Sequence, residues 1–156
     1  MAKARPIAID PDEPFAVAAR ATLAVRGPEL LEFRDGTLLG ADIEERHSMR
    51  VASRRLRAAL EVYAGCFPPK RHARLLKLVK DTADALSEAR DLDVQIDFLT
   101  GFADKAPHDH RPGIESLIDL LRARRVAADE HLAPALARLD EERFLQQVKQ
   151  LVESKG

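Results

Sequence analysis

Apolar residues recur at helical spacing through most of the chain, and no window shows sustained alternation of apolar and polar positions. Glycine, proline and turn-forming pairs divide this pattern into segments. The expected helices cover about 14–26, a short piece to 33, about 42–64, 70–101 as one helix or two meeting near 90–91, 114–134 and the residues after 140. The sequence therefore predicts an all-α fold.

The boundaries of these segments rest on local signals. Gly27 and Pro28 should end the first helix, and a turn is expected through residues 35–36 and Gly40. Asp42 and Glu45 have the spacing of a capping box, and Gly65 is suited to the end of the helix that follows. Residues 107–113 form an expected loop, and Pro134 should stop or kink the helix before it.

We expect an antiparallel bundle of about four to six helices, made of residues 14–156 and preceded by a tail of residues 1–13. With 156 residues, 46% of them hydrophobic, the chain suits one domain with a substantial core. The one cysteine, Cys66, rules out an internal disulfide framework. No apolar run has the length of a signal peptide or a membrane span, so we expect a cytoplasmic protein without a membrane partner.

The net charge of -1 conceals a strong segregation of charge along the chain. Residues 46–80 contain ten Arg and Lys and one acid, Glu61, which is a balance of +9 and leaves -10 on the rest. A basic block inside an acidic protein creates a local positive field in which anions concentrate. This block is where function is expected.

The first helix of the basic block has a cationic stripe. At about 100° per residue, His47, Arg50, Arg54 and Arg57 fall within roughly 80° of arc. The opposite face is apolar and consists of Met49, Ala52, Leu56, Ala59, Leu60 and Tyr63. Like charges at these spacings repel, so the stripe predicts an anion that completes it.

The following helix repeats this arrangement, with Lys70, Arg74, Lys77 and Lys80 opposite an apolar side. The short connection through residues 67–69 predicts antiparallel neighbours whose basic faces line one groove. Arginine forms bidentate contacts with phosphate and lysine adds compact charge, so the mixture suits a phosphate chain.

The motif His47-x-x-Arg50-Val-x-x-Arg54-Arg55-Leu-Arg57, followed by Arg90-Asp-Leu-Asp-Val, resembles the CHAD family, the conserved histidine α-helical domain. The resemblance covers about residues 41–99. It implies an all-helical domain that binds inorganic polyphosphate, without catalysis, and that often localises to polyphosphate granules. Carried over by position, and with the neighbouring cations of the block, the implied site comprises His47, Arg50, Arg54, Arg55, Arg57, Arg74, Lys77, Lys80 and Arg90.

The chain departs from the family pattern in two ways. Ser87 stands where family members usually have a glycine shortly before the Arg-Asp pair. The family fold also usually has two helical halves, each with its own motif, facing each other across a basic channel. Only the first motif is present here, so either one half binds alone or two copies form a homodimer that completes the channel.

Two other function classes fit parts of the pattern. A histidine phosphotransfer bundle would use His47, although Val51 follows Arg50 where such domains usually have small residues. A phosphate-backbone binder would use the same stripe on nucleic acid. The lack of Trp and the position of Tyr63 on the apolar side argue against base stacking and hence against nucleic acid.

The remaining polar clusters are expected to have no chemistry of their own. We interpret His108-Asp109-His110 as a turn and expect no metal or cofactor. Asp91, Asp93 and Asp97 are expected to orient nearby cations or limit their field. With no nucleophile or phosphate-cradling glycine loop beside them, we expect a binding module and not an enzyme.

Overall fold

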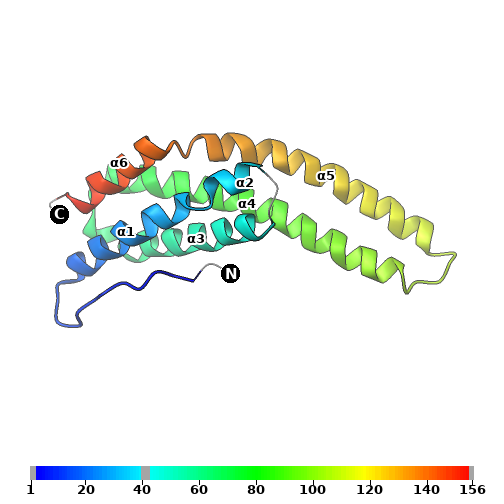
Figure 1. Ribbon diagram of the computed structural model, residues 1–156, viewed down its shortest axis with the longest axis horizontal. Coiled ribbons are helices and arrows are strands. Elements are labelled where there is room, and N and C mark those ends of the chain that lie inside the picture. The colour runs from blue at the N-terminus through cyan, green and yellow to red at the C-terminus, as the bar shows by residue number, and fades with distance from the viewer. Residues whose placement is uncertain (1–2, 40–42, 155–156) are drawn as a thin grey trace.

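The computed structural model describes residues 3–39 and 43–154, and these fold into six α-helices with no strand. Figure 1 shows their arrangement. The helices are α1 (Phe15–Leu31), α2 (Arg34–Leu39), α3 (Ile43–Val62), α4 (Pro69–Ala103), α5 (Arg111–Ala137) and α6 (Glu141–Val152), with a short 3-10 helix, η1 (Ala64–Cys66), between α3 and α4. The predicted all-α bundle is confirmed.

Four helices enclose the core of the body, which is the part on the left of Figure 1. Helix α1 packs on α3 and α6, and α4 packs on α3. The C-terminal end of α5 adds Leu132 and Leu136 to the same core. Its fully buried side chains include Leu23, Leu30, Met49, Leu56, Leu60, Leu75, Val79, Leu86, Phe144 and Leu151.

The second half of α4 and the first half of α5 leave the body as a two-helix arm, on the right of Figure 1. We define the arm as residues 94–124. The buried residues of α4 all lie between His72 and Ala89, so the arm part of this helix contributes none. Ile118 and Leu121 of α5 are buried within the hairpin itself. The arm is thus held mainly by contact between its own two helices.

The predicted end of the first helix at Gly27–Pro28 is wrong, because α1 continues to Leu31. Pro28 removes one backbone hydrogen bond, but Leu30 beyond it is fully buried and anchors the last turn. Gly27 has a packing role instead, since a Cβ there would lie 2.9 Å from Cγ1 of Val148 on α6. The glycine therefore permits the close approach of α1 and α6.

The turn expected at residues 35–36 is also wrong, because these residues belong to α2. Thr37 fixes this short helix, donating from its hydroxyl to the carbonyl of Phe33 at 2.7 Å. The rest of that expected turn, Gly40, and the capping residue Asp42 lie outside the described residues.

The structure also settles the remaining helix boundaries. Residues 69–103 form one helix, and α3 ends at Val62, before the expected Gly65. Helix α5 begins at Arg111, so residues 111–113 of the expected loop are helical. Pro134 does not stop this helix, because Leu132, Ala135 and Leu136 around it are buried in the body. The predicted last helix is confirmed, with Asp140 accepting the backbone N–H of Arg143 at 3.0 Å. No described helix is both long and apolar enough to cross a membrane.

Candidate anion-binding surface

The amphipathic character predicted for α3 is confirmed by burial. Met49, Ala52, Leu56 and Leu60 are buried, as the helical pattern requires. The polar face carries His47, Arg50 and Arg57, which are half-buried, and Arg54, which is exposed. The hydroxyl of the buried Ser53 donates a hydrogen bond to the Arg50 carbonyl at 2.8 Å. This hydroxyl is thus satisfied within the helix, away from the charged face. The cationic side chains are therefore left at the surface.

Ion pairs between α3 and α4 fix the register of the two helices. Nη1 of Arg57 lies 3.5 Å from Oδ1 of Asp84, and Nζ of Lys80 lies 3.2 Å from Oε1 of Glu61. Nearer the other end, Nη1 of Arg46 lies 3.9 Å from Oδ2 of Asp93. Residue numbers rise on α3 as they fall on α4, so the helices are antiparallel, as predicted.

This register places Arg90 of α4 close to the level of Arg50 of α3, and Lys80 beside the end of the α3 stripe. Six of the predicted residues thus lie along two adjacent helices in a known register. We call this surface the basic seam and define it as His47, Arg50, Arg54, Arg57, Lys80 and Arg90.

Carboxylates occupy one end of the basic seam. Oε1 of Glu61 accepts a hydrogen bond from Nε of Arg57 at 3.1 Å and also faces Lys80. Hydrogen bonding by Arg57 and then Lys80 lowers the pKa of the Glu61 carboxyl. The group is exposed, so these contacts add little to stability. Their effect is electrostatic, because an ionised carboxylate offsets two cations at this end.

The other end of the basic seam has cations without such partners. Within the described ranges, no carboxylate oxygen lies within 4.0 Å of Arg50, Arg54 or Arg90. Nε of Arg50 is buried and has no hydrogen-bond acceptor there. A buried N–H without an acceptor is costly. The excess positive charge is thus concentrated around Arg50, Arg54 and Arg90.

Three predicted site residues do not join the basic seam. Nζ of Lys77 pairs with Oδ2 of Asp81 at 2.8 Å, and that carboxylate also lies 3.8 Å from Nη1 of Arg138. Arg74 is about 120° around α4 from Lys80, by the helical repeat. Arg55 lies about 100° around α3 from Arg54, with which it shares a shallow hollow. Their role in binding stays a prediction.

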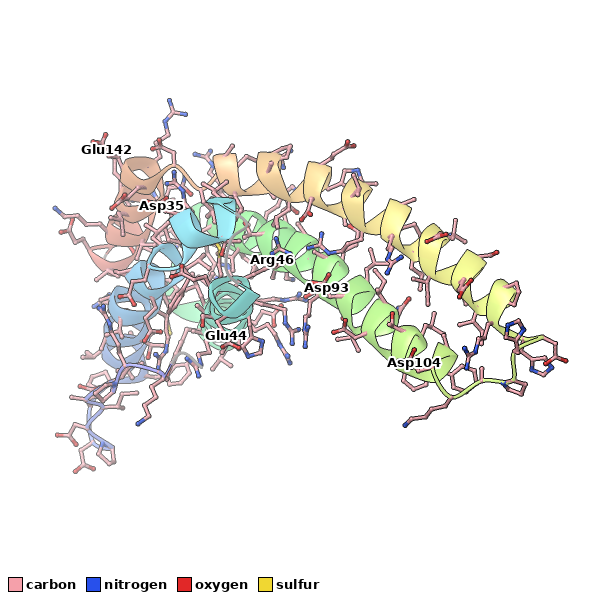
Figure 2. The ribbon with its side chains drawn as sticks, turned by 45° about the vertical axis from the view of Figure 1, so that its right-hand side comes forward. Asp35, Glu44, Arg46, Asp93, Asp104 and Glu142 are labelled. Carbon is pink, nitrogen blue, oxygen red and sulfur yellow. The ribbon has the colours of Figure 1, made fainter. Side chains whose placement is uncertain are left out.

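A second charged cluster lies at the base of the arm and was not predicted from the sequence. Nε of Arg125 donates to Oδ1 of Asp93 at 2.6 Å, and its Nη1 lies 2.7 Å from Oδ1 of Asp129. Arg46 faces the same two carboxylates, and Figure 2 shows it beside Asp93. Burial alone would lower the pKa of Arg125, but hydrogen bonding by Asp129 and Asp93 outweighs it and raises that pKa.

This cluster links α3, α4 and α5 and removes Arg46 from the basic surface. It also explains part of the acidic run on α4, because Asp93 orients cations as expected, although its partners are Arg46 and Arg125 and not Arg90. Only the Arg125–Asp129 pair has a local signal, because these residues are four apart on one helix. The sequence holds no such signal for the pairs of Asp93 with Arg46 and Arg125, or of Arg46 with Asp129, because these residues lie far apart in the chain. Elsewhere, no three His, Cys, Asp or Glu side chains of the described residues gather as metal ligands would.

Comparison with known families supports the resemblance seen in the motifs. The CHAD domain family matches residues 22–156, a longer stretch than the residues 41–99 that carry the motifs. This family is associated with binding of polyphosphate or triphosphate. No curated protein matches the chain. With most of its length matched, and with the motif residues gathered on two adjacent helices, the chain belongs to the CHAD domain family.

Proposed function

We propose that the basic seam binds inorganic polyphosphate without catalysing a reaction. The observation that carries this proposal is the line of cations from two helices, of which Arg50, Arg54 and Arg90 have no carboxylate partner among the described residues. Membership of the CHAD family supports the same ligand class. The fork of arginine binds phosphate oxygens in bidentate fashion, so these three residues would supply most of the contacts.

The shape of the basic seam favours a phosphate chain over a single phosphate group. His47 and Arg57 are ten residues apart on α3, which is about 15 Å along the helix axis. A single phosphate would engage one or two of these side chains, whereas a linear polyanion can contact cations along the whole row. At one end of the basic seam, Glu61 and Asp84 form ion pairs with Arg57 and Lys80. These pairs support an electrostatic role for the two carboxylates and not acid-base catalysis.

The proposal is tested by titrating the protein with long-chain polyphosphate and with single-stranded RNA at several salt concentrations. We expect tighter binding of polyphosphate, with an affinity that falls steeply as salt rises because counterions are released. Equal or better binding of RNA would replace the proposal with a general phosphate-backbone binder. A His47→Asn variant incubated with acetyl phosphate, beside the unaltered protein, tests phosphotransfer. Acid-labile phosphate that depends on His47 would favour that class.

In cells, the same proposal predicts that the protein associates with polyphosphate granules. A fluorescent fusion should concentrate on granules in cells that accumulate polyphosphate. The matched variant, Arg50→Ala with Arg54→Ala, should spread through the cytoplasm, because two of the cations without carboxylate partners are gone. Granule localisation of both proteins alike would mean that the basic seam is not the targeting surface.

A further inference from the structure

The outward side of α4 in the arm carries a stripe of exposed apolar side chains. Val94, Phe98 and Phe102 are spaced i, i+4 and i+8 and are 48%, 70% and 53% exposed. The rings of Phe98 and Phe102 stack with centroids 6.4 Å apart. On the adjacent helix α5, Leu117 and Leu120 are 44% and 52% exposed. Scattered exposed apolar residues are ordinary, but a row along one helix marks an interaction surface.

We propose that this stripe is the surface on which a second copy of the chain docks, with the two α4 helices antiparallel across a two-fold axis near Phe98. The proposal does not depend on polyphosphate binding, because the stripe contains none of the residues of the basic seam. A two-fold pairing requires a surface that is complementary to itself. The charges at the two ends of the stripe have this property.

Asp91 and Lys105 bracket the stripe, seven residues on either side of Phe98. The backbone N–H of Lys105 donates to the carbonyl of Phe102 at 3.1 Å, so the helical turn continues to this residue. Asp91, Val94, Phe98, Phe102 and Lys105 then fall within about 80° of arc. Asp91 and Lys105 are both exposed, with no ion pair inside the described part of the chain.

The antiparallel arrangement pairs each of these residues with a suitable partner. Phe98 would meet Phe98 of the second copy, and Val94 would meet Phe102 of the second copy. Asp91 would lie opposite Lys105 of the second copy, and the two-fold axis repeats this ion pair at the other end. A parallel arrangement would instead place Asp91 against Asp91, which repels. The charge pattern therefore selects the antiparallel pairing.

Gly101 is a second, independent observation at the same surface. It lies in the last turn of α4, three residues after Phe98 on the outward side, and its backbone is in an ordinary negative-φ conformation. A Cβ at Gly101 would meet nothing within 4 Å, so the single chain has no steric need for glycine there. Glycine within a helix is unfavourable. Close approach of a second helix would account for it.

The stripe is large enough to contribute substantially to an interface. Large apolar and aromatic side chains have roughly 150–250 Å² of surface each, so the three residues of the stripe together with Leu117 and Leu120 of α5 offer about 400–500 Å². A stable interface buries about 800 Å² on each partner. The remainder would come from the polar rim, including Asp91, Gln95 and Lys105, which are all exposed.

The first test is sedimentation equilibrium of the protein without polyphosphate over a wide concentration range. We expect a reversible monomer–dimer equilibrium, with a dissociation constant at least about tenfold higher in Phe98→Glu. Val126→Glu is the control, because Val126 is 63% exposed on α5 but lies outside the stripe. A strict monomer at all concentrations, or equal weakening by both variants, would overturn the proposal. Circular dichroism should show that both variants keep their helicity.

The second test addresses the register of the pairing. Asp91→Lys and Lys105→Asp should each weaken the dimer, and the double variant should restore it, because the swapped charges meet across the two-fold axis. Gly101→Leu should also dissociate the dimer while the monomer stays folded, since a Cβ at this position meets no atom of its own chain within 4 Å. Failure of the double variant to restore pairing would exclude this register.

Discussion

Arg50 and Arg54 are the residues on which the proposed anion contact depends most. Replacing both by Ala should weaken polyphosphate binding by roughly tenfold or more for each residue, because charge-assisted hydrogen bonds contribute about 1.5–3 kcal/mol. The plot of affinity against salt should also become flatter, since fewer counterions are released. The melting temperature should change little, because neither side chain is in the core. Fluorescence anisotropy with labelled polyphosphate measures both quantities.

The matched control replaces Arg122 and Arg143 by Ala, which removes the same charge from exposed positions on α5 and α6. This control should bind almost as the unaltered protein does. If both double variants lose affinity alike, binding depends on the net charge of the protein, and the basic seam is not a specific binding surface. If the Arg50 and Arg54 variant unfolds, these side chains have a structural role that their exposure does not show.

Glu61 limits the positive charge of the basic seam, so its removal should strengthen binding. Its pKa is lowered by Arg57 and Lys80, so the carboxylate is ionised at neutral pH and competes for both cations. Glu61→Gln should tighten polyphosphate binding roughly two- to fivefold, the size of an exposed ion pair. Isothermal titration at neutral pH would show this. Glu115→Gln, an equal charge change on the arm, should have no effect, and weaker binding by Glu61→Gln would contradict the argument.

At the scale of single residues, the sequence predicts well the part of the site that lies on α3. The helical repeat alone places His47, Arg50, Arg54 and Arg57 on one face of α3, because these residues are close together in the chain. It does not show which cations already have partners. Arg46 belonged to the predicted basic block, yet its carboxylates come from α4 and α5, and Arg57 is paired with Asp84. Such pairs depend on helix packing, which the charge pattern does not contain.

At the scale of elements, the five longer helices were predictable, whereas the short helix α2 and several helix ends were not. The apolar faces of α3 and α6 follow from spacing, and both are confirmed by burial. Pro28 and Pro134 were expected to end or bend helices, but α1 and α5 run through them. In both cases a buried leucine lies just beyond the proline. Tertiary packing thus offsets the cost of about 3 kcal/mol that the proline imposes locally.

Arg125 should be the residue that joins the base of the arm to the body. Its side chain is 13% exposed and lies between Asp93 and Asp129, which also face Arg46. Arg125→Ala leaves two carboxylates beside a single arginine, so unfolding should become easier by about 1–3 kcal/mol. Denaturant unfolding followed by circular dichroism measures this change.

Arg124 provides the control at the adjacent position, because it is exposed and lies about 100° around α5 from Arg125. Arg124→Ala removes the same side chain and should alter stability by less than about 0.5 kcal/mol. Equal destabilisation by the two variants would mean that the ion pairs at the base of the arm contribute nothing beyond helix propensity. Polyphosphate affinity should be nearly unchanged in both, because neither residue is in the basic seam.

The arrangement of the whole molecule was the least predictable. The sequence indicates two long helical segments after residue 69, but not that their far halves leave the body together as an arm. The absence of a second motif suggested instead a homodimer in which two basic surfaces face each other across one ligand. That arrangement stays a prediction. The exposed stripe offers a different dimer, in which the basic seams lie on opposite sides of the axis at Phe98.

The two arrangements differ in how polyphosphate length should affect assembly. In the arm-paired dimer each seam is separate, so a chain long enough to reach both gains affinity through effective concentration, whereas a short chain occupies one seam. Long polyphosphate should therefore increase the dimer fraction more than short polyphosphate at equal phosphate, by mass action. Sedimentation velocity with defined chain lengths measures this.

Phe98→Glu should abolish the advantage of long chains and leave the binding of short ones unchanged. If short chains promote dimers as strongly as long ones, two basic surfaces share a single ligand and the facing arrangement is favoured. A monomer that binds one long chain with unchanged affinity would show that a single basic seam is sufficient.

The backbone hydrogen bonds of α4 should open at different free energies along the helix. Its buried residues all lie between His72 and Ala89, although the helix continues to Ala103. Amide protons in the first part should exchange with deuterium only through global unfolding, and those in the arm through smaller openings that cost less free energy. Along α4, pairing of two arms would raise the protection factors of the arm part, residues 94–103, and not those of the first part. The gradient of deuterium uptake along one helix would thus report the assembly state of the protein.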